Sequence, residues 1–74
     1  MPSVDRAPAA DAAIRGAGLR ITAPRQAVYD ALRVHPHASA DDVHRWVRTR
    51  LDSASMQSVY NVLGDFADAG LVRR

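Results

Sequence analysis

Residues 55–70, "SMQSVYNVLGDFADAG", place uncharged hydrogen-bonding side chains and a tyrosine among apolar residues at helical spacing. The apolar face of such a helix consists of Val59, Val62, Leu63, Phe66 and Ala67. The opposite face then carries Gln57, Ser58 and Asn61, with Tyr60 on the flank. Gln and Asn amides can pair bidentately with adenine, and a Tyr ring can pack on the thymine methyl group. This spacing indicates recognition of DNA bases by the first turns of a helix.

The second half of the same helix is acidic, so base recognition can apply only to its first half. Asp65 and Asp68 would repel phosphates, so we expect this half to lie beyond the major groove. A plainer alternative stays open: the amides are solvated residues on an exposed face, and Tyr60 belongs to the edge of the core. The position of the segment as the last helix of a helix-turn-helix unit favours base recognition.

Capping residues predict the helices that position this segment. A short first helix is expected from about Asp11, burying Ile14 and ending at Gly16 or Gly18. Thr22 is the expected N-cap of a second helix that has Pro24 in its first turn and ends before Pro36.

Two further helices follow the "HPHA" loop. Ser39 is the expected N-cap of a third helix, whose buried residues at helical spacing are Val43, Trp46 and Val47. Ser55 is the expected N-cap of the last helix, and Gly70 fits the left-handed position after its end.

The predicted fold is mainly α, a winged helix-turn-helix domain truncated at the start of its β-wing. We expect residues 1–9 to be a flexible N-terminal arm and residues 10–74 to form the winged-helix domain. "LVRR" is interpreted as the beginning of the wing, with the wing itself and a C-terminal dimerisation and metal domain absent. A chain of 74 residues can form one small domain.

Composition narrows the function classes. Every one of the 10 basic residues is Arg and every one of the 8 acidic residues is Asp, and the pI of about 9.9 permits a nucleic-acid partner. The sequence contains no cysteine, which excludes disulfides and thiolate chemistry within these residues. No apolar run suggests a membrane span and no leader suggests secretion, so we expect a cytoplasmic location. Without a Ser/His/Asp order, a carboxylate pair in a cleft or a glycine-rich phosphate loop, we do not expect an enzyme.

Three stretches in order, "GLRITAPRQAVYDAL", "HPHASADDV" and "SVYNVLGDFADAGLVRR", resemble the DNA-binding domain of the ferric uptake regulator (Fur) family. The resemblance runs from about Ile14 to the last residue. The "HPHA" loop and "GLVRR" are most similar to the actinobacterial branch, repressors beside catalase-peroxidase genes that respond to iron and oxidative stress. The resemblance implies a transcriptional repressor that binds double-stranded DNA, acting as a homodimer in its full-length form.

The resemblance also implies roles for individual residues. Tyr60 matches a tyrosine that contacts bases in the major groove, and Arg20 stands where the family usually has a lysine reaching into the minor groove, a role suited to an A·T-rich groove. Arg25 matches an arginine that is a plausible phosphate contact. Asn61 departs from the arginine of many members, which favours adenine contact over guanine contact. The expected DNA-binding residues are Arg20, Arg25, Ser55, Gln57, Ser58, Tyr60 and Asn61.

Metal chemistry is expected of the full-length family and not of this chain. His37 matches the one metal-sensing histidine that the family places in this domain, but its partner ligands lie further along the chain, and the family's structural zinc uses cysteine pairs. We therefore expect no cofactor here, and Fe(II) or Zn(II) in the full-length form. The alternative function is a small helical protein-interaction module that does not bind DNA.

Overall fold

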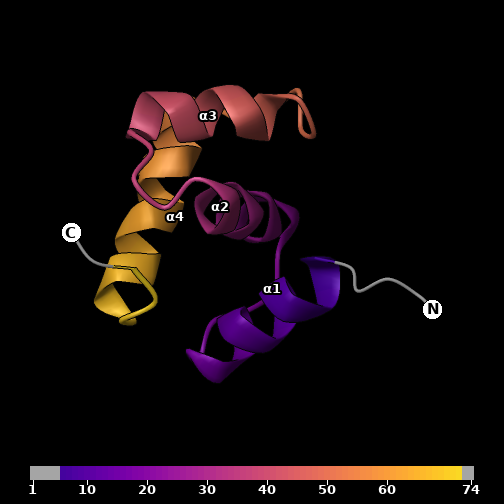
Figure 1. The fold of residues 1–74 in the computed structure, drawn as a ribbon, viewed down its shortest axis with the longest axis vertical. Helices are drawn as coiled ribbons and strands as arrows, with labels where there is room; N and C mark the ends of the chain where they lie inside the picture. The colour runs from indigo at the N-terminus through magenta and orange to yellow at the C-terminus, as the bar shows by residue number, and fades with distance from the viewer. Residues whose placement is uncertain (1–5, 73–74) are drawn as a thin grey trace.

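The structure is a computed structural model that describes residues 6–72 and consists there of four helices, with no strand (Figure 1). The helices are α1 (Arg6–Gly16), α2 (Ala23–Val34), α3 (Ala40–Arg48) and α4 (Met56–Asp68). This confirms the mainly α class. Leu71 and Val72 form a bend where we expected the wing strand to begin, and residues 73–74 lie outside the described part.

The first helix begins earlier than expected. Because α1 starts at Arg6 and not near Asp11, residues 6–9 are helical, which corrects the boundary that we predicted for a flexible arm. Residues 1–5, the rest of that arm, lie outside the described residues. Alanine dominates this stretch, and Pro8 falls in the first turn, where a missing N–H costs no intrahelical bond. Burial of Ala10 against the core adds a reason for the helix to extend.

Three predicted N-caps are confirmed by their geometry. The side-chain oxygens of Thr22, Ser39 and Ser55 each accept the backbone N–H three residues later, at 3.3, 3.1 and 3.0 Å. Each bond satisfies one of the N–H groups that a helix start leaves without a partner. The start of α4, and with it the orientation of its first turn, is therefore fixed locally.

Two glycines end helices in the left-handed conformation. Gly70 has a φ of 81° after α4, and Leu71 N–H donates to the carbonyl of Phe66 at 2.8 Å. Gly18, with a φ of 82°, ends α1 in the same way, where Leu19 N–H donates to the Ile14 carbonyl at 3.1 Å. Both are Schellman-type ends, as the sequence predicts for Gly70.

One core holds the helices together, and α2 is its centre. α2 contacts α1, α3 and α4, and Figure 1 shows it between α1 and α3. The buried apolar residues come from all four helices: Ala10, Ile14, Ala27, Val28, Val43, Val47, Val59, Val62 and Phe66. Trp46, which we expected in the core, is only half-buried and stacks on His35 with ring centroids 4.0 Å apart. None of the described helices is long and apolar enough to cross a membrane.

Candidate nucleic-acid interface

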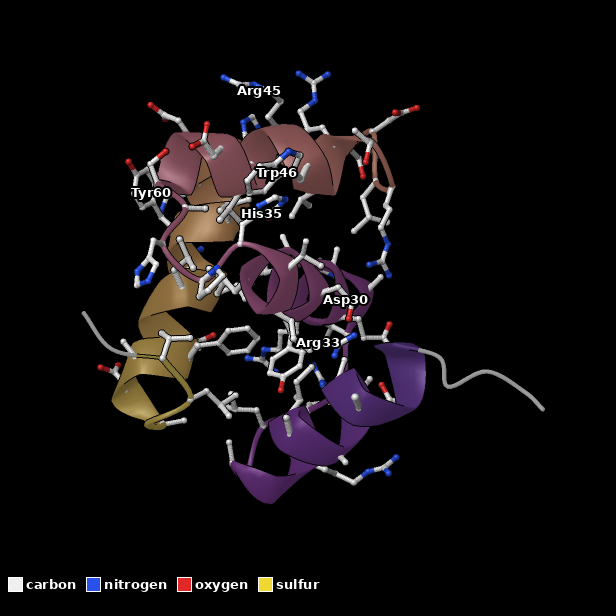
Figure 2. The ribbon with its side chains drawn as sticks, in the orientation of Figure 1. Asp30, Arg33, His35, Arg45, Trp46 and Tyr60 are labelled. Carbon is white, nitrogen blue, oxygen red and sulfur yellow. The ribbon has the colours of Figure 1, made fainter. Side chains whose placement is uncertain are left out.

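The first two turns of α4 present a polar surface to solvent, which we call the recognition surface: Gln57, Ser58, Tyr60 and Asn61. On the opposite side, Val59, Val62 and Phe66 are buried, as the helical spacing predicts. Tyr60 is 53% exposed, which is high for a residue with a large apolar ring. Figure 2 shows it pointing away from the helix bundle. This exposure favours the flank position that we predicted for Tyr60, and its contact with bases stays a prediction.

The two amides of the recognition surface are joined. Gln57 Nε2 donates to Asn61 Oδ1 at 3.0 Å, across one helical turn, and both residues are exposed. This bond leaves the Gln57 Oε1 acceptor and the Asn61 Nδ2 donors for other partners. A free acceptor beside a free donor complements the N6 amine and N7 atom of adenine.

Ser55 and Ser58 contribute in a different way. The Ser55 hydroxyl oxygen accepts the Ser58 N–H as the cap, and Ser58 itself is only partly exposed. The N–H groups of the first turn ahead of Ser58 have no carbonyl partner inside the helix. The start of α4 therefore offers N–H donors and the positive end of the helix dipole to an anion such as phosphate.

Arg20 and Arg25 lie beside each other but in different environments. Arg20 is exposed in the loop between α1 and α2. The guanidinium of Arg25 donates to two groups of the chain: Nη2 to Asp65 Oδ2 at 3.0 Å, and Nη1 to the Arg20 carbonyl at 2.7 Å. Only 20% of the Arg25 side chain is exposed. Arg25 therefore already has partners that compete with a phosphate, and Asp65 carries a compensated charge next to α4's exposed face.

A second ion pair fixes the turn between α3 and α4. Arg50 Nη1 donates to Asp30 Oδ2 at 2.8 Å, and Asp30, on α2, is the buried polar residue of the core at 6% exposure. Asp30 Oδ1 has no hydrogen-bond partner in the described chain. On the other side of the turn, the His44 ring Nε2 lies 3.1 Å from the carbonyl of Ala54, next to the Ser55 cap. Neither contact has a local sequence signal, so neither could be predicted from the sequence.

The histidines do not come together as a metal site. His37 is exposed in the loop after α2, His35 stacks on Trp46 between α2 and α3 (Figure 2), and His44 contacts a backbone carbonyl. Among residues 6–72 there is no group of three His, Cys, Asp or Glu side chains that could hold a metal ion. A zinc or iron site needs at least three such protein ligands, so the residues described here do not fit the metal that the family resemblance implies.

Comparison with known proteins gives a consistent result. The sequence model described as "Ferric uptake regulator family" matches residues 16–74. Ferric uptake regulation protein 1 of Mycolicibacterium fortuitum is 54% identical over 61 residues, which cover 82% of this chain and 38% of that protein. Transcriptional regulator FurA of Mycobacterium tuberculosis is 46% identical over 61 residues, covering 82% of this chain and 42% of the relative.

A more distant relative is the peroxide-responsive repressor PerR of Staphylococcus epidermidis, 36% identical over 63 residues, covering 84% of this chain and 42% of that protein. The chain thus spans about two fifths of the length of these relatives. No solved structure matches it significantly.

Proposed function

The chain belongs to the ferric uptake regulator family, and we propose that it is the DNA-binding part of a sequence-specific transcriptional repressor. The observation that carries the proposal is the recognition surface, where Tyr60 is 53% exposed beside the hydrogen-bonded Gln57 and Asn61. An exposed aromatic ring and two amides on the first turns of a capped helix suit base recognition better than solvation. The names of the matched relatives, regulators and repressors, support the same class and give no reason to propose an enzyme.

In this proposal the first half of α4 enters the major groove. Tyr60 packs on a thymine methyl group, while Gln57 Oε1 accepts from the N6 amine of an adenine and Asn61 Nδ2 donates to its N7 atom. The capped start of α4, at Ser55 and Ser58, faces a backbone phosphate through its N–H groups.

Arg20 makes the second groove contact of the proposal. Its side chain is exposed on the loop that precedes α2, and the planar guanidinium suits a narrow, A·T-rich minor groove, where the negative potential is enhanced. Contacts in two adjacent grooves would give one module both base recognition and shape recognition.

We further propose that a longer chain, of the length of the matched relatives, acts as a homodimer in the cytoplasm and responds to iron or zinc and to oxidative stress. The names "ferric uptake regulation protein" and "peroxide-responsive repressor" of two relatives support this. Joining two modules raises avidity by ~10²–10⁴. The 74-residue chain itself should therefore bind DNA near the non-specific range of ~10⁻⁴–10⁻⁶ M. Adding Fe(II) or Zn(II) should leave this affinity unchanged, because the described residues hold no ligand cluster.

Salt dependence tests the proposal. Each phosphate contact contributes about −0.9 to the slope of log K against log salt concentration, so we expect a slope of about −2 or steeper for this chain on a labelled mixed-sequence duplex. Fluorescence anisotropy at several salt concentrations measures it. No binding to the duplex at low salt would instead favour the alternative, a helical module that docks on another protein through apolar surface, since such a module has no cations placed to contact phosphates.

A further inference from the structure

We propose that Arg25 and Asp65 form a positioning link that sets the distance between the recognition surface of α4 and the minor-groove residue Arg20. The proposal rests on the proposed function and deepens it. The pair itself touches no base. It would still determine DNA specificity, because the recognition surface and Arg20 would have to contact the duplex at one fixed spacing.

The link consists of a single guanidinium group with two partners. Arg25, in the first turn of α2, donates from Nη2 to Asp65 Oδ2 at 3.0 Å and from Nη1 to the Arg20 carbonyl at 2.7 Å. Because the guanidinium is planar and rigid, the two partners are held in one plane at a defined separation. The Arg25 side chain is 20% exposed and the Asp65 side chain 45% exposed, so water and salt reach the pair mainly from the Asp65 side.

Each partner of Arg25 lies next to a proposed DNA contact. Asp65 is one helical turn after Asn61, about 6 Å along the axis of α4. Rotation or sliding of α4 at Asp65 would therefore move the recognition surface by a similar amount. At the other end, the link holds the backbone of Arg20 while its side chain remains exposed. The Arg20 guanidinium can thus enter a groove while the backbone of Arg20 stays in a fixed position.

The loop that carries Arg20 is anchored on both sides of this residue, and the link is the bond that holds the Arg20 carbonyl itself. Gly18 ends α1, and Thr22 caps α2, so Leu19, Arg20 and Ile21 lie in neither helix. Leu19 and Ile21 are partly buried against the core, which should keep the loop attached when the link is removed. The expected consequence of removing the link is a variable position of Arg20, and not loss of the fold.

The competing role for Arg25 is the phosphate contact that the family resemblance implies. In that role the guanidinium would exchange Asp65 for a phosphate, and the contact would add about −0.9 to the salt slope. In the positioning role Arg25 stays paired, and replacing the pair by neutral side chains leaves the slope unchanged. The two roles therefore predict different salt dependence for the same variant.

The test is a selection of DNA sequences from a random duplex library by the whole chain, comparing the wild type with the double variant Arg25→Gln/Asp65→Asn. This double variant removes the link without changing the net charge. The matched control is Asp42→Asn/Arg45→Gln, which has the same charge change. It removes an exposed ion pair (3.3 Å) that lies within α3 and therefore does not connect two helices or loops.

We expect the wild type and the control to select an A·T-rich element at one distance from the bases that α4 contacts. A contact displaced by one base pair should cost as much as a mismatch, so the discrimination against neighbouring spacings should be at least about fivefold. For the double variant we expect both sequence preferences to persist, the discrimination between spacings to fall below about twofold, and the salt slope to stay the same.

Different results overturn different claims. A double variant that keeps the single spacing refutes the positioning role, and a salt slope weaker by about 0.9 identifies Arg25 as a phosphate contact instead. If the wild type selects no sequence at all, the proposed function itself fails. Circular dichroism checks the fold of the double variant. If the double variant unfolds, the single variant Asp65→Ser takes its place. Serine has no carboxylate to pair with Arg25, so we expect the same loss of discrimination between spacings.

Discussion

Replacing Arg50 by Gln should destabilise the domain by about 2 kcal/mol, because it leaves the carboxylate of Asp30 without its counter-charge. Asp30 is 6% exposed, and its Oδ2 is held by Arg50 Nη1 at 2.8 Å. Removing one partner of a fully buried ion pair costs about 3–5 kcal/mol. Here 49% of the Arg50 side chain is exposed, so water reaches the pair and the cost should lie below that range.

Thermal unfolding followed by circular dichroism measures this cost. For a domain of this size, 1 kcal/mol corresponds to about 4–8 °C in Tm, so Arg50→Gln should lower the Tm by about 8–16 °C. The double variant Asp30→Asn/Arg50→Gln removes both charges and should recover at least half of that loss, since the buried group is then neutral. A loss below about 2 °C for the single variant, or a double variant as unstable as the single one, would refute the reasoning.

Three smaller changes test other parts of the account. Ser55→Ala should cost about 1 kcal/mol by removing the α4 cap, and unchanged urea unfolding would show that the hydroxyl contributes nothing. Gly70→Ala should cost about 1 kcal/mol, because its φ of 81° is strained for any residue with a Cβ, although open space surrounds that position. Arg20→Ala should weaken binding in anisotropy titrations more on duplexes with A·T-rich flanks than with G·C-rich flanks; equal weakening would reduce Arg20 to an ordinary phosphate contact.

Local signals in the sequence were sufficient for most of the fold. Thr22, Ser39 and Ser55 each cap a helix within three residues of themselves, and Gly70 ends a helix within one turn, so the sequence alone is sufficient to place each of them. The buried face of α4 follows from helical spacing, which needs no knowledge of its partners. The start of α1 was missed because Pro8 and the small residues around it are compatible with a coil as well as with a first turn.

Contacts between distant residues could not be predicted in this way. Arg25 and Asp65 are 40 positions apart, and Asp30 and Arg50 are 20 apart, so no periodicity connects them. The family resemblance implies that Arg25 contacts phosphate, whereas in the fold its guanidinium already has two partners. Trp46 shows the same limit: its helical spacing predicts burial in the core, but it is half-buried and stacks on His35.

The central claim is that the first half of α4 recognises bases through Tyr60, and sequence selection from a random duplex library by Tyr60 variants tests it most directly. Tyr60→Phe keeps the ring that packs on thymine, whereas Tyr60→Ala removes a side chain that is 53% exposed and should leave the fold intact. Val34→Ala, at a side chain with 56% exposure at the end of α2, is the matched control. We expect the wild type, Tyr60→Phe and Val34→Ala to select the same sequence, and Tyr60→Ala to lose the preference for thymine at the position that the ring contacts, with unchanged circular dichroism. Selection of that thymine by Tyr60→Ala as strongly as by the wild type would contradict the claim.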